Sequence, residues 1–350
     1  MKTAAAACYS GWDIGGAHLK VARCDNKGRV ITAIELPCPL WQGADQLRRA
    51  LRTAFDSLGN ANDRHFVTMT GELVDVFANR QVGVSEILNH LLEYISTDKL
   101  SIYGRDGWLS VDQARDQWQA VASMNWLATA SFTAASINEG LLVDIGSTTT
   151  DIVPLQNGLA QPQGYEDFQR QQLGELAYTG AIRTPLIALS EQAPFEGRWL
   201  SLAAEVFATT GDCWCLLNYL DASEISDRSA DGMPWHPAAC EQRLARLLGT
   251  DADRGTTAQW LLLARWFTEK QLQKITQATL QVLSAQPSLD PQSPVIGAGI
   301  GRFIAHQLAD RLQRPYLDLA MLYDNHKAAA DFAPATALAL LAQQQFSHIA

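Results

Sequence analysis

The sequence contains one short pattern twice, and this repeat limits the possible folds more than any other feature. Asp13-Ile14-Gly15-Gly16 near the start matches Asp144-Ile145-Gly146-Ser147 in the middle of the chain. A second apolar run follows each copy and ends in a turn, at Asn26-Lys27-Gly28 and at Asn157-Gly158. Repeated units of this kind indicate two lobes of similar design. A chance likeness between two short β-hairpins is the alternative.

Each copy has the composition of a buried strand that ends at an anion-binding turn. The run from Leu141 to Ile145 is apolar except for Asp144, as expected for a strand buried on both faces. A carboxylate there is costly unless a cation or hydrogen bonds meet it. Asp13 and Asp144 are therefore candidate metal ligands. The candidate phosphate-binding residues, which combine free backbone amides with hydroxyls, are Gly15, Gly16, Gly146, Ser147, Thr148 and Thr149. A Thr-rich turn without a ligand is the alternative.

The length of the chain predicts two lobes, because 350 residues exceed one typical hydrophobic core. We expect an α/β protein with a first lobe at 1–139, carrying an inserted subdomain, and a second at 140–350. The second lobe is expected to carry a helical insertion and a closing helix that packs back. Strands are predicted at 9–14, 19–24, 30–36, 66–69 and 294–300, and helices at 44–58, 113–135, 200–209, 258–283, 302–312 and 335–346.

A third glycine-rich strand end lies late in the chain. The strand ends in Gly297-Ala298-Gly299-Ile300-Gly301, and the helix predicted at 302–312 follows at once. A strand, glycines and a helix start expose backbone amides at the positive end of the helix dipole. We therefore add Gly297, Gly299, Gly301 and Arg302 to the candidate diphosphate or nucleotide site.

Composition excludes some classes of partner and leaves others open. The formal net charge is -10 and no basic stripe occurs, which argues against nucleic acid and anionic membranes. None of the six cysteines forms a C-x-x-C pair, which favours reduced, buried thiols. No apolar run approaches a membrane span, and the N-terminal apolar stretch is too short for a signal peptide. We expect a cytoplasmic protein, and its oligomeric state, a homo-oligomer included, stays open.

These motifs resemble those of the actin, sugar-kinase and Hsp70 ATPase superfamily, in which two ribonuclease H-like lobes enclose a central cleft. More closely, the chain resembles the hydantoinase/oxoprolinase-related proteins of tetrahydromethanopterin-linked one-carbon metabolism. The segments that carry this likeness are Gly11–Ala17, Thr68–Leu73, Phe77–Arg80, Trp126–Ala130, Val143–Asp151, Tyr178–Gly180, Arg183–Pro185 and Gly297–Arg302.

The resemblance implies a synthase. Archaeal members resemble methanofuran synthase, which joins an aminomethyl-furan diphosphate to the phenol of a tyramine derivative and releases diphosphate. In methylotrophic bacteria the implied product is the related methylofuran, made from a tyramine- or tyrosine-derived phenol. True hydantoinases continue their first motif with Thr-Phe-Thr-Asp, where this chain has Ala17-His18-Leu19-Lys20. This departure argues against ATP-driven opening of a hydantoin ring.

Roles for individual residues follow from this hypothesis. Asp13 and Asp144 hold Mg²⁺ on the diphosphate, directly or through water, and Lys20 adds a positive charge to the leaving group. Glu72, just past a buried strand, is the candidate base for the phenol proton. The alternative for Lys20 is a solvated lysine on the hairpin, and the alternative for Glu72 is a carboxylate in the first turn of a helix.

Other polar residues have weaker assignments. Asp151 and Thr70 are expected to support the residues that contact the diphosphate. Arg80 and Arg183 reach anions or form surface pairs, and a structural role is favoured for His18 over a catalytic one.

Two other functions fit the same motifs. An ATP-dependent small-molecule kinase would use the glycine loop at 297–302 for adenosine. A nucleotide-binding relative without catalysis would keep the hairpins and make no product. The expected partners of the synthase are a small-molecule diphosphate and a phenolic amine.

Overall fold

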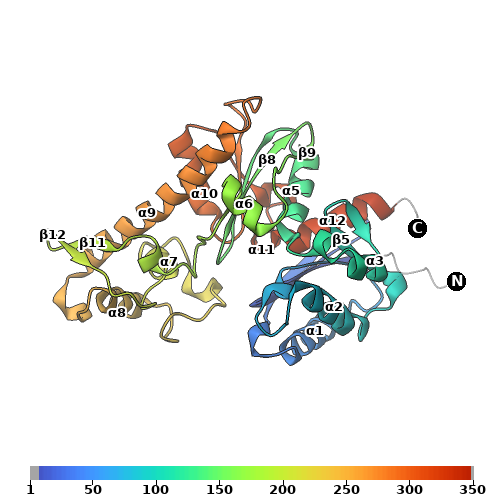
Figure 1. Cartoon of the computed structure of the whole chain (residues 1–350), viewed down its shortest axis with the longest axis horizontal. Helices are drawn as coiled ribbons and strands as arrows, with labels where there is room; N and C mark the ends of the chain where they lie inside the picture. Colours follow the sequence, from blue (N-terminus) through green and yellow to red (C-terminus); the bar gives the residue numbers. More distant parts are fainter. Residues whose placement is uncertain (1–7, 348–350) are drawn as a thin grey trace. The chain divides into compact units, whose positions relative to one another are not determined.

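The computed structural model describes residues 8–347, which divide into two compact units (Figure 1). Unit 1 comprises Met1–Gly140, Leu155–Gln169 and Leu319–Ala350, and unit 2 comprises Leu141–Pro154 and Arg170–Asp318. The predicted second lobe at 140–350 therefore included Gly140 and two longer segments, 155–169 and 319–350, that belong to unit 1. The later segment does so because its closing helix packs on the first strand of the unit 1 sheet.

The unit 1 sheet has the strand order β3-β2-β1-β4-β5-β6. Its strands are β1 (Tyr9–Ile14), β2 (His18–Cys24), β3 (Val30–Pro37), β4 (Arg64–Met69), β5 (Leu100–Gly104) and β6 (Gly107–Leu109). The first three strands form an antiparallel meander, and β4 then pairs parallel with β1. Strand β5 continues in parallel with β4, and β6 returns antiparallel.

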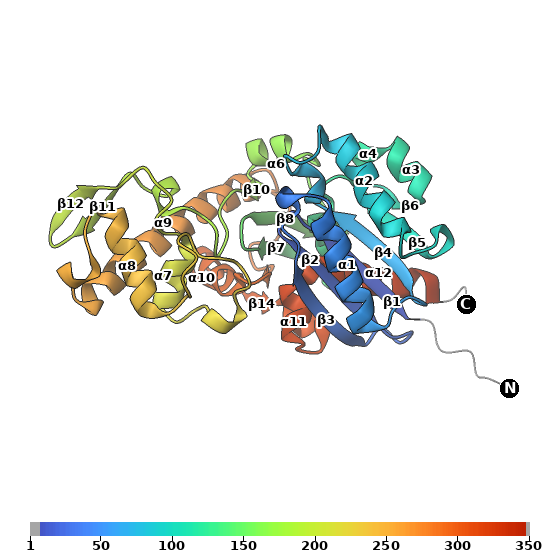
Figure 2. The same ribbon diagram turned by 90° about the horizontal axis from the view of Figure 1, so that it is seen from below.

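Helices cover both faces of this sheet. They are α1 (Asp45–Leu58), α2 (Arg80–Leu92), α3 (Val111–Asp116), α4 (Trp118–Val121), α5 (Asn125–Ser136), α11 (Lys327–Asp331) and α12 (Ala333–Phe346). Helix α1 places its apolar stripe in a core with Trp12 and Ile14 of β1, while α12 packs against β1 and α5 (Figure 2). All six residues of β1 are buried, as expected for a central strand covered on both faces.

The unit 2 sheet has the strand order β10-β8-β7-β13-β14. Its strands are β7 (Gly140–Ile145), β8 (Thr150–Gln156), β10 (Leu176–Ala177), β13 (Val295–Ala298) and β14 (Tyr316–Asp318), and the short β9 (Leu159–Ala160) pairs with the end of β8. Strand β13 runs parallel to both β7 and β14. The other elements are α6 (Asp167–Leu173), a hairpin of β11 (Gln192–Phe195) and β12 (Arg198–Ser201), α7 (Thr210–Leu216), α8 (Pro237–Leu247), α9 (Thr257–Ser284) and α10 (Arg302–Leu312).

The two sheets repeat one topology, in which an antiparallel hairpin is followed by parallel strands. The likeness extends to single hydrogen bonds. The Gly15 amide donates to the His18 carbonyl at 3.0 Å, and the Gly146 amide donates to the Thr149 carbonyl at 2.9 Å. The predicted fold class, α/β with one design repeated in two lobes, is confirmed.

Two predicted helices are wrong. The expected helix at 113–135 is three helices, interrupted because Ala122 forms a parallel bridge with Met69 of β4. The expected helix at 200–209 is the end of β12 followed by an irregular segment with bends, and the helix begins only at α7. Thr209 and Asp212 form a capping box that starts that helix at Thr210.

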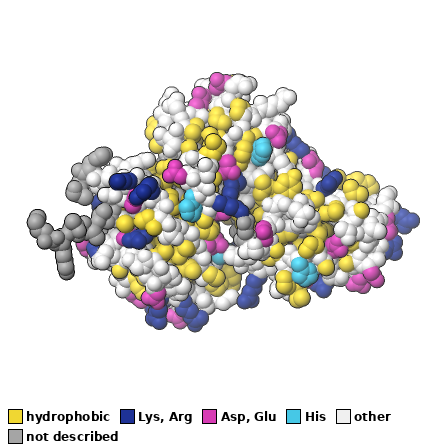
Figure 3. All heavy atoms as spheres, turned by 180° about the vertical axis from the view of Figure 1, so that it is seen from behind, with side chains coloured by type: hydrophobic (Ala, Val, Ile, Leu, Met, Phe, Trp, Pro, Cys, Tyr) yellow, Lys and Arg dark blue, Asp and Glu magenta, His cyan; other side chains and the backbone are white. Residues whose placement is uncertain are grey.

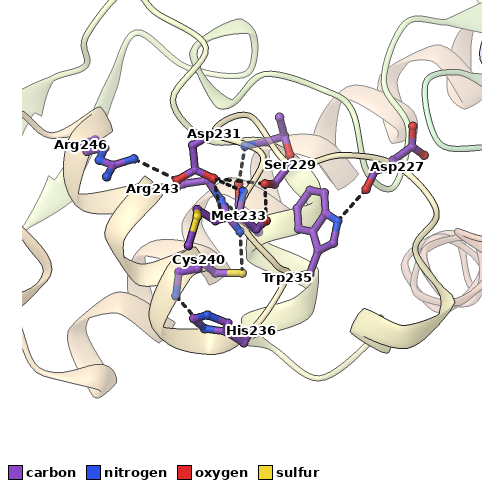
Figure 4. Close-up of polar contacts among 12 residues, drawn as sticks. Asp227, Ser229, Asp231, Met233, Trp235, His236, Cys240, Arg243 and Arg246 are labelled. Carbon is purple, nitrogen blue, oxygen red and sulfur yellow. Dashed lines mark hydrogen bonds and ion pairs between the residues drawn. The ribbon is translucent and has the colours of Figure 1, made fainter. Parts of the chain in front are cut away.

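The polar segment before α8 is held by a buried arginine (Figure 4). The Arg243 side chain, fully buried, donates to Asp212 at 2.6 Å and to Asp231 at 3.0 Å. Arg246 binds the other Asp231 oxygen at 2.9 Å. The loop predicted at 221–237 is therefore tied to helix α8 by ion pairs, and the same arginine ties α8 to α7.

The surface carries mixed charge on the face drawn in Figure 3, where basic and acidic side chains are interspersed with exposed hydrophobic ones. None of the helices in the described part of the chain combines the length and apolar character needed to cross a membrane.

Gly11 on β1 tests the packing of α12 on the sheet. A Cβ at Gly11 would lie 2.0 Å from the Ala335 carbonyl oxygen and 2.7 Å from the Ala339 amide nitrogen. We expect Gly11→Ala to lower the free energy of unfolding by about 3 kcal/mol, because backbone cannot move aside cheaply. Differential scanning calorimetry measures the shift.

The matched control is Gly59→Ala, at a position with a φ of 55° and no atom within 4 Å of the added Cβ. Its cost is confined to left-handed backbone strain, about 1 kcal/mol. Equal shifts for the two variants would contradict close packing of α12 on β1.

Candidate functional site

Asp13 lies at the carboxyl end of β1 and is buried without full hydrogen bonding. Its residue is 4% exposed, and its Oδ1 atom has no hydrogen-bond partner among the described residues. Burial raises the pKa of the Asp13 carboxyl, and Lys20 and a hydrogen bond with the Asn125 side chain oppose this shift. An incompletely paired buried carboxylate is the group that a cation would stabilise.

Glu72 lies in the 3-10 helix η2 (Gly71–Leu73), directly after β4, and forms a second buried cluster in unit 1. Its Oε1 accepts from Arg80 at 3.1 Å and from the Ser123 hydroxyl at 3.0 Å, while Oε2 has no partner in the described structure. Burial raises the pKa of Glu72, and Arg80 partly offsets this. Gly83 on α2 permits this arrangement, because a Cβ there would lie 2.7 Å from the Glu72 carbonyl oxygen.

The interruption between α4 and α5 delivers two polar residues that the sequence analysis missed. Ser123 has a φ of 55°, and its amide donates to the Met69 carbonyl at 3.1 Å. Asn125 then starts α5 beside Asp13. A non-glycine residue in the left-handed region is uncommon and concentrates at functional sites. The interruption at Ser123-Met124-Asn125 does not show in the sequence, because the apolar pattern around it is that of one continuous helix.

The other unit 1 candidates lie around the first hairpin. Lys20 faces Asp13 across the hairpin register, and its Nζ lies 3.9 Å from a Glu35 oxygen. Gly15 needs to lack a side chain, because a Cβ there would lie 2.9 Å from the His18 carbonyl oxygen. At Gly16 a Cβ would meet Val74 at 2.8 Å. Thr70 follows β4, and its amide donates to the Ile14 carbonyl.

In unit 2 the glycine loop after β13 packs on the strand end that carries Asp144. Asp144 is 8% exposed. A Cβ at Gly299, which has a φ of 75°, would lie 2.5 Å from the Asp144 Oδ1 atom and 2.4 Å from the Ile145 carbonyl oxygen. A Cβ at Gly301 would clash with the Ile145 side chain, and the Gly301 amide donates to the Ile145 carbonyl at 2.8 Å. These glycines let the loop before α10 pack on Asp144 and Ile145.

The hydroxyl-rich turn of unit 2, at 147–149, is held by hydrogen bonds from a second turn at 180–183. The Ser147 carbonyl accepts from the amides of Ile182 and Arg183. A Cβ at Gly180 would lie 2.5 Å from the Ser147 carbonyl group, so only glycine allows this contact. The Thr148 and Thr149 residues reach solvent, which leaves their side chains accessible to an anion.

Several polar residues near this turn have structural partners. The buried Thr150 hydroxyl donates to the Thr179 carbonyl at 2.7 Å. Asp151 accepts from the buried Arg170 at 2.7 Å, which the sequence pattern did not reveal. Arg183 lies 3.8 Å from Asp227 and is partly exposed.

Gly297 and Arg302 serve packing within unit 2. A Cβ at Gly297 would lie 2.5 Å from the Tyr316 hydroxyl oxygen. Arg302 is largely buried, with Nε 3.2 Å from an Asp318 oxygen and Nη1 3.1 Å from the Gly299 carbonyl oxygen. Gly297 is therefore explained by sheet packing, and Arg302 holds the glycine loop in place.

The described residues contain no group of three or more His, Cys, Asp or Glu side chains arranged to hold a metal ion. Mg²⁺ commonly binds proteins through one or two carboxylates together with substrate phosphates and water.

Comparison with known proteins agrees with this geometry. A model of the hydantoinase/oxoprolinase family matches residues 63–345. The chain belongs to the hydantoinase/oxoprolinase family. The match covers the unit 2 hairpin and glycine loop, whereas the hairpin that carries Asp13 precedes it.

Two curated relatives carry the same name. The chain is 30% identical over 246 residues to "(4-{4-[2-(gamma-L-glutamylamino)ethyl]phenoxymethyl}furan-2-yl)methanamine synthase" of Methanocaldococcus jannaschii, covering 69% of this chain and 72% of the relative. It is 34% identical over 126 residues to the protein of that name from Methanococcus vannielii, covering 36% of this chain and 56% of the relative.

Among solved structures, the nucleotide-free structure of an ATP-dependent acetone carboxylase aligns with a TM-score of 0.57 at 9% identity, covering 95% of this chain and 70% of the other. This likeness shows the fold alone.

Asp13 tests whether a buried carboxylate with an unpartnered oxygen lowers the stability of the fold. We expect Asp13→Asn to raise the free energy of unfolding at pH 7 by about 1 kcal/mol, because a neutral amide costs less to bury than a carboxylate. Since the folded-state pKa of Asp13 lies above its usual 3.8, folding favours the protonated form. The wild-type penalty therefore grows as pH rises from 3.8 through the folded-state pKa, and the variant lacks it. Thermal unfolding across pH measures both effects.

Asp63 is the matched control. It is also 4% exposed, but it accepts from Arg23 at 2.6 Å and from the Ser10 hydroxyl at 2.7 Å. Asp63→Asn is expected to lower stability by roughly 1–3 kcal/mol. A loss of stability in both variants would contradict the description of Asp13 as incompletely paired.

The Glu72 cluster makes a second prediction. Arg80→Met leaves the buried Glu72 carboxylate with Ser123 as its remaining partner, so we expect a loss of about 3 kcal/mol at pH 8. The loss of stability should shrink as pH falls, because the raised pKa lets Glu72 take up a proton at a higher pH than an ordinary glutamate does. The neutral side chain no longer needs the charge of Arg80. The double variant with Glu72→Gln should recover most of it. A pH-independent loss in thermal unfolding would show that Arg80 acts through packing.

Proposed function

We propose that this protein is a synthase of methanofuran or methylofuran biosynthesis. It joins an aminomethyl-furan diphosphate to the phenol of a tyramine- or tyrosine-derived substrate, forming an ether and releasing diphosphate. The observation that carries this proposal is the 30% identity over 246 residues to a synthase whose name describes such a phenoxymethyl-furan product. Its place would be the supply of a cofactor for tetrahydromethanopterin-linked one-carbon metabolism.

The proposed reaction exchanges one carbon–oxygen bond for another. The bond between the furfuryl carbon and diphosphate breaks, and its electron pair leaves with diphosphate. The furan oxygen spreads the positive charge that develops on the carbon. The phenol oxygen then forms the ether bond and loses its proton. Such chemistry requires a grip on the diphosphate, exclusion of water and an oriented phenol.

The two hairpins are the proposed diphosphate-binding elements. The Gly15-Gly16 turn and the Ser147–Thr149 turn each follow a buried aspartate and share the same internal hydrogen bond. Lys20, across the register from Asp13, is the proposed cation for the leaving group.

Mg²⁺ fits the donor set, because the Asp13 carboxylate is buried with an unpartnered Oδ1. Asp13 would hold the ion in unit 1, and Asp144 occupies the equivalent strand position in unit 2. Bound Mg²⁺ would neutralise charge on the diphosphate leaving group.

Glu72 is the proposed acceptor of the phenol proton. Its Oε2 has no partner among the described residues, and burial raises its pKa above the usual 4.5, which makes the carboxylate a better proton acceptor. Arg80 and Ser123 orient the carboxylate through its other oxygen.

The direct test incubates the purified chain with an aminomethyl-furan diphosphate, Mg²⁺ and tyramine, γ-glutamyltyramine or tyrosine. We expect ether and diphosphate to form in equal amounts. Mass spectrometry measures the ether, and a diphosphate assay measures the diphosphate. Asp144→Asn should lower the rate by about 100-fold or more, whereas Asp56→Asn on α1 serves as the control and should not. Consumption of ATP with phosphorylation of an alcohol or amine, and no ether, would favour the kinase alternative.

A further inference from the structure

Two threonines of unit 1 have buried hydroxyls that nothing in the described structure engages. Thr68 of β4 and Thr129 of α5 are both 0% exposed, and the Oγ1 atom of each lacks a hydrogen-bond partner among the described residues. Buried hydroxyls in folded proteins are nearly always paired, because an unpaired one gives up its bonds to water without replacement. Two such hydroxyls in one unit therefore indicate a bound group that they serve.

Thr68 lies next to Asp13 in the sheet. Strands β1 and β4 run parallel, and their register pairs Asp13 with Thr68. The preceding residues, Trp12 and Val67, both belong to the core that includes the apolar side of α1. Because side chains alternate along a strand, Asp13 and Thr68 share the opposite face of the sheet. Two unpartnered oxygens, Asp13 Oδ1 and Thr68 Oγ1, thus lie on one face of adjacent strands.

Helix α5 carries the second hydroxyl. Asn125, the first residue of this helix, donates a side-chain hydrogen bond to the Asp13 carboxyl. Thr129 follows four residues later, which places it on the same side of the helix as Asn125. The helix also contacts β4, the strand of Thr68. The two hydroxyls therefore come from the two elements that adjoin the Asp13 carboxylate.

This combination of one carboxylate and two hydroxyls suits a hydrated divalent cation. Mg²⁺ bound by one or two carboxylates keeps several water ligands, and these waters need hydrogen-bond acceptors. A hydroxyl oxygen accepts such a bond without adding charge. A water molecule alone would pair the hydroxyls, whereas a cation with its waters also neutralises the buried carboxylate. The arrangement therefore favours an ion over water alone.

We propose that Thr68 and Thr129 are positioning residues for a Mg²⁺ ion on Asp13, and that their hydroxyls accept hydrogen bonds from its water ligands. The inference rests on the proposed function, in which Asp13 holds Mg²⁺, and extends that site to β4 and α5. It has a consequence that packing alone does not. Each hydroxyl lowers the stability of the metal-free protein and strengthens binding of the ion.

Thr68→Val separates these two effects, because valine keeps the shape of threonine and removes the hydroxyl. We expect this variant to raise the melting temperature of the metal-free protein and to weaken binding of Mn²⁺, used as the probe, about tenfold. Electron paramagnetic resonance measures free Mn²⁺, and the binding that Asp13→Asn removes defines the site. Thr129→Val should act in the same direction. Thr68→Ser, which keeps a hydroxyl, should retain the affinity.

The matched control is Thr133→Val on α5. Thr133 is also 0% exposed, but its hydroxyl already donates to the Thr129 carbonyl at 2.7 Å. We expect this variant to lower the melting temperature and to leave Mn²⁺ affinity unchanged. A loss of affinity equal to that of Thr68→Val would show that any change in buried threonines disturbs the site, and would overturn the inference.

The remaining outcomes separate this inference from the proposed function. An unchanged Mn²⁺ affinity in either Thr68→Val or Thr129→Val overturns the role of that threonine. Wild-type protein without Asp13-dependent Mn²⁺ binding overturns the inference together with the proposed role of Mg²⁺. Ether formation by a protein whose Mn²⁺ affinity no threonine variant changes overturns this inference alone. Hydroxyl-dependent Mn²⁺ binding without any ether formation supports the inference and refutes the proposed synthase.

Discussion

The structure depends on burying a carboxylate at the end of a central strand. Asp13 and Asp144 each lie one residue before the end of a strand whose residues are all buried. Removing a carboxylate from water is strongly unfavourable without a compensating charge. At Asp13 the compensation within unit 1 is incomplete, since one oxygen has no partner in the described structure. Such a position lowers stability and is understandable as a site kept for a ligand.

Close backbone contacts explain how each aspartate is held. In unit 2, Gly299 and Gly301 allow the loop after β13 to rest on Ile145 and Asp144, and Gly180 allows a further turn to rest on Ser147. In unit 1 the corresponding strand end is followed by η2, which Gly83 accommodates on α2. The two units thus use the same strand order and the same first hydrogen bond, but different elements complete them.

The difference between the units suits a division of chemistry. Unit 1 adds a buried carboxylate, Glu72, whose free oxygen and raised pKa suit proton transfer. Unit 2 adds the hydroxyl-bearing residues Thr148 and Thr149, which reach solvent on its turn.

Local pattern alone determined the twin strands, their turns and the family. Strand β1 and helix α10 have the predicted bounds, because hydrophobic periodicity and glycine breaks are properties of adjacent residues. Tertiary contacts decided the rest. The pairing of Ala122 with Met69 breaks an apolar segment that would otherwise continue as helix, and so places Ser123 and Asn125 at the site. The partners of Glu72, and the return of α12 to β1, join residues far apart in sequence. No local pattern encodes such contacts, because their energy exists only once the intervening chain has folded.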